Sequence, residues 1–382
     1  LDTLKAARST RRRARLEEFH TKLRSLNFLD PACGCGNFLV LTYRELRRLE
    51  LDVLRALHIK DGEQQQVLNV RELCSVDVDQ FYGIEIHEWP VRIAEIALWL
   101  MDHQMNVEVA EAFGQSFRRL PLQNTPHIVQ GNALRIEWNT ILPKDKCNYI
   151  LGNPPFVGKQ FATSEQKQDM ALICGKVKGS GVLDYVTGWY FKAGEYIQDT
   201  HIVVGFVSTN SITQGEQVGI LWNDLFARYR LKIHFGHRTF AWESEARGKA
   251  HVHVVIVGFA AFDTTNKRIY DYEANGQNVT VTTTNNISPY LVSGSDLVVL
   301  SRNKPLCDVP EIVFGNMPND GGYLLLTDEE KNELLKQEPV AAEFVRLFFG
   351  SQEFINGETR WCLWLKDASP AKLRALPEVM KR

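Results

Sequence analysis

The sequence predicts an α/β fold in which a mainly parallel β-sheet is covered by helices on both faces. Short apolar segments alternate with amphipathic helical segments between residues 26 and 259. A glycine-rich turn at residues 30–38 follows the first apolar segment, at the position where open α/β sheets bind ligands. The last two apolar segments lie close together in the chain and predict an antiparallel hairpin at one edge of the sheet.

The individual elements follow from the hydrophobic spacing. Residues 1–25 combine several arginines with a helical pattern, so we expect a surface helix. Good helix formers with one apolar face predict a helix over 38–57, and a proline in the first turn opens another over 90–103. Short apolar runs bounded by turn residues predict seven strands, at residues 26–29, 81–84, 127–129, 149–151, 202–207, 231–235 and 251–259.

The composition changes after residue 262, where Thr, Asn and Gly replace the periodic apolar residues. We expect residues 1–262 to form the first domain and residues 263–300 to form a linker or β extension. Residues 301–382 are expected to begin a second domain of α+β type. In that segment a helix is predicted near 328–337 and an aromatic strand at 361–365.

The overall composition excludes some classes of protein. The 382 residues include 44 Lys and Arg and 46 Asp and Glu, which gives a formal charge of −2 and excludes a broadly basic DNA binder. Seven irregularly spaced cysteines favour a reducing compartment, and no apolar run approaches the roughly 18 residues of a membrane helix. The chain begins at Leu1 rather than Met, so we expect it to be part of a longer polypeptide.

The glycine-rich turn reads Asp30-Pro31-Ala32-Cys33-Gly34-Cys35-Gly36-Asn37-Phe38. Leu39 occupies the place of the third glycine of a dinucleotide fingerprint, and the Gly-Lys-Ser/Thr of a Walker loop is absent. An acid beside exposed backbone suits a ligand with a cationic group, such as a sulfonium with an amino acid tail. By itself such a motif is more often a tight turn, in which the glycines serve only the backbone geometry. Cys33 and Cys35 lack partners at zinc spacing, so we interpret them as small buried turn residues and predict no metal site.

Two polar residues follow the next strands. Glu85 ends the second strand, where a carboxylate can accept hydrogen bonds from both hydroxyls of a ribose. Asn132 follows the third strand, where it can hydrogen-bond the exocyclic amine of an adenine ring. Alone, each is also compatible with an ordinary strand end.

The fourth strand runs into Asn153-Pro154-Pro155-Phe156. The two prolines fix the backbone and remove two N–H donors, so the carbonyl groups of Asn153 and Pro154 are held rigidly as acceptors. Such a pair suits a planar amino group conjugated to a ring or a carbonyl, and hydrogen bonds to both of its N–H groups would make that nitrogen more nucleophilic. Phe156 then offers a flat face on which the ring can stack.

In this order, the segments LDPACGCGNF, GIEI, GNAL and GNPPF resemble S-adenosylmethionine-dependent DNA methyltransferases that act on the N6 amine of adenine and have a Rossmann-like class I fold. The segments GNPPFVGKQ, GFVSTNSI and ARGKAHVHVVIVGF look most like the type IIL restriction-modification enzymes of the MmeI kind. Those enzymes join nuclease, methyltransferase and target-recognition domains in one bacterial, cytoplasmic polypeptide. The resemblance therefore implies double-stranded DNA as the partner.

The resemblance also implies roles for individual residues. The cofactor S-adenosylmethionine would be bound by Asp30, Pro31, Ala32, Gly34, Gly36, Asn37, Phe38, Glu85, Ile86, Asn132 and Ala133. The catalytic residues would be Asn153, Pro154, Pro155 and Phe156. The flipped base would stack on Phe156 from one side and on Phe240 or Trp242 from the other, with Phe240 preferred.

A flipped base must be held by contacts to the surrounding DNA. The basic residues expected to make them are Lys159, Lys176, Lys178, Arg238 and Lys249. The segment 157–181 is interpreted either as a flexible loop that orders over DNA or as a solvated surface loop.

Two departures from the family are expected. The family helix that closes over the cofactor should contain aromatic or Thr residues, and residues 1–24 show no convincing match to it. The Glu-x-Lys matches to a nuclease motif fall in polar contexts. We therefore expect the nuclease and the rest of the recognition domain to lie outside this chain. Three alternatives remain open: a protein-glutamine methyltransferase, a cytosine-N4 enzyme, which more often has Ser at position 153, and an inactive DNA-binding module.

Overall fold

The computed structural model describes residues 11–60, 63–64, 73–114, 124–242, 252–273, 278–302, 304–309, 315, 320–366 and 368–382. The chain divides into two compact units, Leu1–Ser301 and Arg302–Arg382. Each unit has an apolar core of its own. No helix among the described residues combines the length and the apolar character needed to cross a membrane.

Among the described residues, the first unit is built on a nine-stranded sheet with the order β11-β10-β8-β9-β7-β6-β1-β4-β5. Strands β1, β4, β5, β6 and β7 run parallel, whereas β9 is antiparallel to both β7 and β8. This arrangement confirms the predicted α/β fold and the antiparallel hairpin, but the hairpin does not form the edge of the sheet, because β10 and β11 lie beyond β8. The strands are β1 (Phe28–Asp30), β4 (Phe81–Glu85), β5 (His127–Gln130), β6 (Tyr149–Gly152), β7 (Val203–Thr209), β8 (Lys232–Trp242), β9 (Val252–Ala260), β10 (Lys267–Tyr272) and β11 (Val279–Thr284).

The sheet has two more strands than the seven predicted. Both β10 and β11 come from the segment 263–300, and β10 pairs in parallel with β8. The residues of β11 are exposed except for the last, which is half-buried, so this edge strand carries no core pattern. Its alternating Val and Thr residues are typical of a strand by propensity alone. The sequence allowed a β extension over 263–300, but the strand predictions relied on buried apolar residues and therefore specified no strand there.

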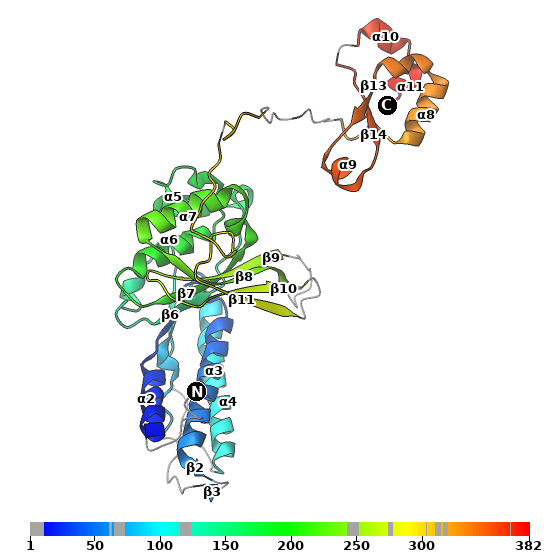
Figure 1. Ribbon diagram of the computed structural model, residues 1–382. Coiled ribbons are helices and arrows are strands. Elements are labelled where there is room, and N and C mark those ends of the chain that lie inside the picture. Colours follow the sequence, from blue (N-terminus) through cyan, green and yellow to red (C-terminus); the bar gives the residue numbers. More distant parts are fainter. Residues whose placement is uncertain are drawn as a thin grey trace. The chain divides into compact units, whose positions relative to one another are not determined.

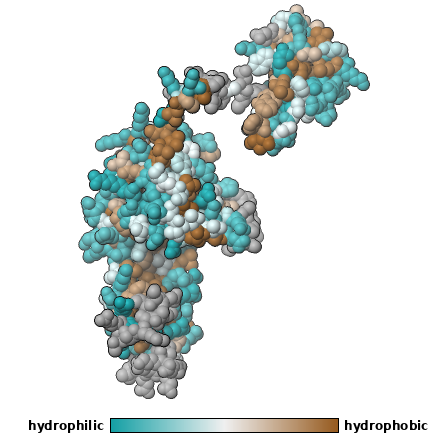
Figure 2. Space-filling model, in the orientation of Figure 1, coloured by the Kyte–Doolittle hydropathy of each residue, from teal (hydrophilic) through white to brown (hydrophobic). Residues whose placement is uncertain are grey.

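Helices cover both faces of this sheet (Figure 1). One layer consists of α2 (Arg11–Ser25), α3 (Asn37–His58) and α4 (Glu88–Ala112), and the other of α5 (Ser164–Cys174), α6 (Thr187–Tyr196) and α7 (Gly215–Tyr229). A short hairpin, β2 (Ile59–Lys60) and β3 (Glu63–Gln64), follows α3. Figure 2 shows mainly hydrophilic residues over the visible outer face of the α5–α7 layer, as expected for helices with one buried side.

The N-terminal segment forms the expected surface helix, α2, with one buried apolar stripe. Leu16 and Leu23 of α2 are buried, at 1% and 2% exposure, in the same cluster as residues of α3 and α4. Arg13, Arg15 and Arg24 are exposed on the remaining side. The helix therefore belongs to the core of the first unit.

The second unit has a small core built around a three-stranded sheet with the order β12-β14-β13. A capping box between Thr327 and Glu330 explains why α8 begins at the predicted residue. The elements are β12 (Leu325–Leu326), α8 (Asp328–Gln337), β13 (Val345–Phe348), α9 (Ser351–Asn356), β14 (Arg360–Leu363), α10 (Pro370–Arg374) and α11 (Pro377–Met380).

Candidate functional site

A cavity of about 540 Å³ lies at the carboxyl ends of β1, β4, β5 and β6. Ligands of open α/β sheets bind at this edge, and small-molecule pockets typically measure roughly 300–1,000 Å³. The lining residues come from the turns after these strands and from the region of α5 and α6. They are Pro31, Ala32, Gly34, Ile84, Glu85, Ile86, His87, Gly131, Asn132, Ala133, Asn153, Pro155, Thr163, Glu165, Gln166, Asp169, Tyr185 and Trp189.

The glycine turn and Glu85 form one wall of the cavity. The N–H of Gly34 donates to Glu85 Oε2 at 3.1 Å, and the N–H of His87 donates to Oε1 at 3.0 Å. Gly34 has a φ of +53°, and no atom lies within 4 Å of the position that a Cβ would occupy. The backbone here is therefore open, and the carboxylate is oriented while keeping lone pairs for a ligand's hydroxyl groups.

Seven of the predicted cofactor residues line the cavity, namely Pro31, Ala32, Gly34, Glu85, Ile86, Asn132 and Ala133. Asn37 and Phe38, which begin α3, are not among the residues that line it. Gly36 does not line it either, since a Cβ there would lie 2.9 Å from Ala94 Cβ of α4. Gly36 thus serves helix packing. Cys33 is buried as expected, whereas Cys35 is exposed.

Asp30 lies behind the cavity wall rather than on it. It is 1% exposed, and its Oδ1 accepts a hydrogen bond from the N–H of Ala32 at 3.0 Å, while Oδ2 is buried with no partner among the described residues. Burial raises the pKa of Asp30 to about 7; the Ala32 N–H opposes this shift and Glu85 adds to it. A cationic ligand group nearby would stabilise the ionised form. A Cβ on Gly152 would lie 2.6 Å from Asp30 Oδ1, so only glycine leaves room for this carboxylate.

The loop after β6 brings an unpaired acceptor to the cavity. Asn153 and Pro155 line it, whereas Pro154 is buried and Phe156 packs half-buried against the core. The Oδ1 atom of Asn153 is buried and has no hydrogen-bond partner among the described residues. Such an atom costs about 1–3 kcal/mol unless a donor reaches it. The loop therefore holds an acceptor ready for an incoming N–H group.

A further wall of the cavity was not predicted from the sequence. It comes from α5 and the segment that leads into α6, with Asp169, Tyr185 and Trp189 among its residues. The Nε1–H of Trp189 donates to the carbonyl of Pro31 at 2.9 Å, which fixes the indole beside the glycine turn. The interpretation of 157–181 as a flexible or solvated loop is wrong for Ser164–Cys174, which form α5. The capping box of Thr163 and Gln166 was the signal for this helix.

The second aromatic candidate lies at the same edge of the sheet as the loop. Phe240 of β8 pairs with Val254 of β9, and Val254 pairs with Thr209 of β7. Thr209 lies three positions beyond Phe206, which pairs with Gly152 at the end of β6. Phe240 thus extends past the end of β6 by about 10 Å along the strands, level with the loop. Its ring packs on Tyr272 with centroids 4.8 Å apart. The side chain of Trp242 lies outside the described residues.

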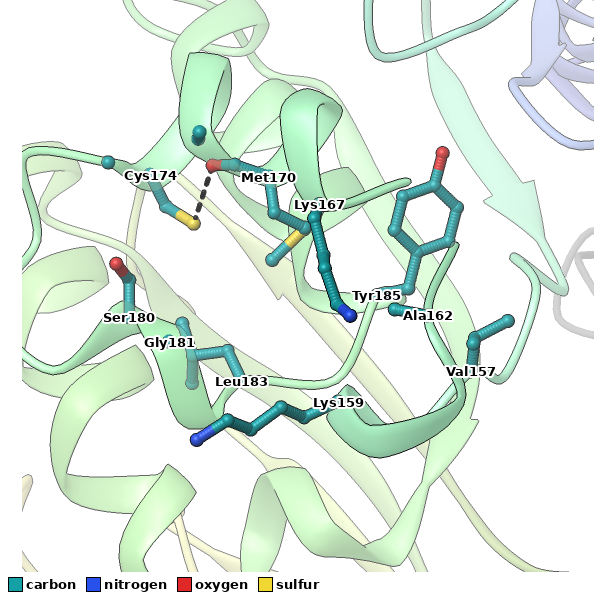
Figure 3. Close-up of a pocket in the computed structure, with 12 residues that line it drawn as sticks. Val157, Lys159, Ala162, Lys167, Met170, Cys174, Ser180, Gly181, Leu183 and Tyr185 are labelled. Carbon is teal, nitrogen blue, oxygen red and sulfur yellow. Dashed lines mark hydrogen bonds between the residues drawn. The ribbon is translucent and has the colours of Figure 1, made fainter. Parts of the chain in front are cut away.

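The residues predicted to contact DNA differ in their exposure and in their partners. Lys159 lines a second cavity, of about 330 Å³, together with Lys167 (Figure 3). Lys176 and Lys178 are exposed in the segment after α5. Arg238 already forms an ion pair with Asp271 at 2.7 Å, so its charge is partly neutralised. Lys249 lies outside the described residues.

Comparison with known proteins identifies the family. Residues 4–271 match the family described as the DNA-methyltransferase domain of MmeI. The chain belongs to the MmeI family. Residues 293–382 also match the MmeI target recognition domain, so both parts of the predicted resemblance are confirmed.

Two of the proteins that this chain resembles are considerably longer than it is. It is 42% identical over 372 residues to DNA methyltransferase A of Bacillus subtilis (strain 168), which covers 96% of this chain and 41% of the relative. It also resembles the solved structure of the type IIL restriction-modification enzyme MmeI in complex with DNA, with a TM-score of 0.84 and 50% identity, over 97% of this chain and 49% of that one. The chain thus spans less than half the length of either.

Proposed function

We propose that this chain is the modification part of a restriction-modification enzyme, which transfers the methyl group of S-adenosylmethionine to N6 of an adenine in DNA. The observation that carries the proposal is the buried, unpaired Oδ1 of Asn153 on the wall of the cavity that the glycine turn and Glu85 also line. A cofactor site and an acceptor for an amino group share one cavity. Methyl transfer to a nitrogen requires this juxtaposition.

The residues around the cavity suit S-adenosylmethionine. The open backbone at Gly34, with the carboxylate of Asp30 behind it, suits the methionine part. The oriented carboxylate of Glu85 suits the ribose hydroxyls, and Asn132 and Trp189 offer a polar group and an aromatic ring to the adenine. When bound, the cofactor supplies an electrophilic methyl group on a sulfonium.

The loop after β6 would activate the substrate amine. The N6 lone pair of adenine is delocalised into the ring, and hydrogen bonds from N6 to Asn153 Oδ1 and to the Pro154 carbonyl would localise it. As the lone pair forms the new N–C bond, the C–S bond breaks towards sulfur, and N6 then releases one proton to solvent. Phe156 would stack the base, and Phe240 is placed to approach its other side.

Two observations support DNA as the substrate rather than a protein glutamine. Residues 293–382 match a target recognition domain, and the exposed Lys176 and Lys178 follow α5, which lines the cavity. Flipping a base out of the duplex costs a few kcal/mol, which phosphate contacts from such lysines would offset.

Labelled methyl transfer tests the proposal. The chain is incubated with duplex DNA and S-adenosylmethionine that carries a trideuterated methyl group, and the digested nucleosides are analysed by mass spectrometry. We expect labelled N6-methyladenine in one sequence context. Label on cytosine N4 or on protein glutamine, or binding of the cofactor without any transfer, would contradict the assignment.

A further inference from the structure

A buried carboxylate that the proposed reaction does not use lies in the wall of the cavity. Asp169, on α5, is only 2% exposed. Its Oδ2 accepts hydrogen bonds from Asn132 Nδ2 at 2.9 Å and from the Tyr185 hydroxyl at 2.7 Å, and its Oδ1 accepts one from Arg135 Nε at 2.5 Å. Three donors from two other segments of the chain therefore converge on one side chain.

These contacts determine how the Asn132 amide is oriented. Its Oδ1 accepts the N–H of Leu134 at 2.9 Å, and its Nδ2 donates to Asp169. A carboxylate accepts only from the amino end of an amide, so Asp169 excludes the flipped orientation. One hydrogen on Nδ2 remains, on a side chain that lines the cavity. The cavity thus meets a hydrogen-bond donor at this position, whereas the predicted contact with the exocyclic amine of adenine would need an acceptor.

The network also keeps Asp169 charged. Burial by itself would raise the pKa of Asp169, but the hydrogen bonds from Asn132, Tyr185 and Arg135 outweigh it and hold the pKa below its usual value. The carboxylate is therefore ionised at neutral pH. An ionised and nearly inaccessible carboxylate is costly to bury and is typical of a functional site.

We propose that Asp169 is a positioning residue of the adenine subsite, which fixes the Asn132 amide as a donor to the ring nitrogen N1 of the cofactor's adenine. The inference rests on the proposed binding of S-adenosylmethionine in this cavity. Adenine presents unprotonated ring nitrogens, whereas hypoxanthine carries a hydrogen on N1 and presents a donor there. A subsite that offers a fixed donor therefore favours adenine over hypoxanthine, and α5 contributes to cofactor selectivity.

Calorimetric titration with two product analogues tests this. S-adenosylhomocysteine and S-inosylhomocysteine differ at the six-membered ring of the base, and we expect the wild-type chain to bind the adenine compound at least about 10-fold more tightly. In the Asp169→Asn variant, the new side-chain amide at position 169 can both donate and accept hydrogen bonds. It therefore no longer determines the orientation of the Asn132 amide. We expect affinity for the adenine compound to fall about 10-fold or more, with little change for the inosine compound, so that the preference disappears.

Three variants and the thermal unfolding of each unliganded protein serve as controls. Gln168→Ala, at an exposed neighbour on α5, should leave both affinities unchanged. Tyr185→Phe removes one hydroxyl but keeps the bond between Asn132 and Asp169, so the preference should persist. If Asp169→Asn does not fold, Asn132→Ala, which leaves Asp169 two donors, should show the same loss of preference.

The possible outcomes separate the two proposals. An equal loss of affinity for both analogues, or no loss for either, would overturn the positioning role of Asp169. A wild-type chain that binds neither S-adenosylmethionine nor either analogue would instead contradict the proposed function.

Discussion

At the residue scale, two buried oxygens without partners characterise the site. Asn153 Oδ1 and Asp30 Oδ2 both lack a hydrogen-bond partner among the described residues. Native proteins seldom leave such atoms unpaired, because each costs free energy. In the proposed reaction, Asn153 Oδ1 would accept from the substrate amine, and Asp30 would face the cationic cofactor from behind the glycine turn.

Replacing Asn153 by Ala should separate chemistry from binding. The variant loses the Oδ1 acceptor, and removal of one such group from a reacting centre typically lowers the rate about 10²–10³-fold. Affinity for S-adenosylmethionine should stay nearly unchanged, as measured by calorimetry, and thermal unfolding should be similar to that of the wild type. Single-turnover transfer to DNA reports the rate. Transfer at the wild-type rate would contradict the proposed role of Asn153 as the acceptor for the substrate amine.

The raised pKa of Asp30 predicts a pH dependence of two quantities. Because the folded-state pKa of about 7 lies above the unfolded value of 3.8, the free energy of unfolding should fall as the pH rises from about 4 to 7 and then level off. Cofactor affinity should rise over the upper part of this range, because ionised Asp30 attracts the cationic ligand.

Asp30→Asn is the variant that checks this. At pH 8 it should unfold at higher urea concentration than the wild type, since it avoids a cost on the order of 3–4 kcal/mol for an ionised buried carboxylate. Its affinity for S-adenosylmethionine should be lower and independent of pH between 6 and 8. A variant that keeps the wild-type pH profile would assign the titration to another group.

At the element scale, the two glycines of the turn have different tasks. Gly34 lines the cavity and has open space at its Cβ position, whereas Gly36 lies where α3 begins and packs against Ala94 of α4. Both have positive φ, at +53° and +84°. The two glycines therefore both have a positive φ, but only Gly36 has another residue packed against its Cβ position.

Substituting each glycine by Ala should therefore have different effects. Gly36→Ala combines positive-φ strain with a clash between helices, and we expect the free energy of unfolding to fall by about 2–4 kcal/mol. Gly34→Ala should cost only about 1–2 kcal/mol in urea unfolding but weaken cofactor binding, because the new methyl group faces the cavity. Equal losses of stability would show that helix packing is not what requires Gly36.

At the scale of the whole molecule, the proposed DNA binding must be compatible with a net charge of −2. Local lysines can solve this problem, and Lys176 and Lys178 are exposed beyond α5. The double variant Lys176→Ala/Lys178→Ala should reduce the slope of log affinity against log salt by about 2, which corresponds to two lost phosphate contacts.

Filter binding at several salt concentrations measures this slope. Lys146→Ala is a suitable control, because this exposed lysine precedes β6 and lies at the opposite edge of the sheet from the cavity. Its slope should match the wild type. An unchanged slope in the double variant would place the DNA contacts elsewhere on the chain.

The sequence alone determined the α/β fold, seven of the strands and the order of the motifs. These features are local, since apolar spacing and proline or glycine act within a few residues of the chain. The carboxyl ends of parallel strands meet at one edge, so Glu85, Asn132 and Asn153 could be assigned to one site from strand order alone. The edge strand β11 was not specified from the sequence, because it has no buried apolar face.

Only the tertiary structure decided the remaining features of the site. Asp169 reaches Asn132 across 37 residues and Trp189 reaches Pro31 across 158, and no local spacing encodes either contact. The raised pKa of Asp30 and the packing role of Gly36 likewise depend on what surrounds each residue in space. Burial, electrostatic environment and side-chain orientation arise from segments brought together by folding, which is why sequence motifs located the site but not its finer architecture.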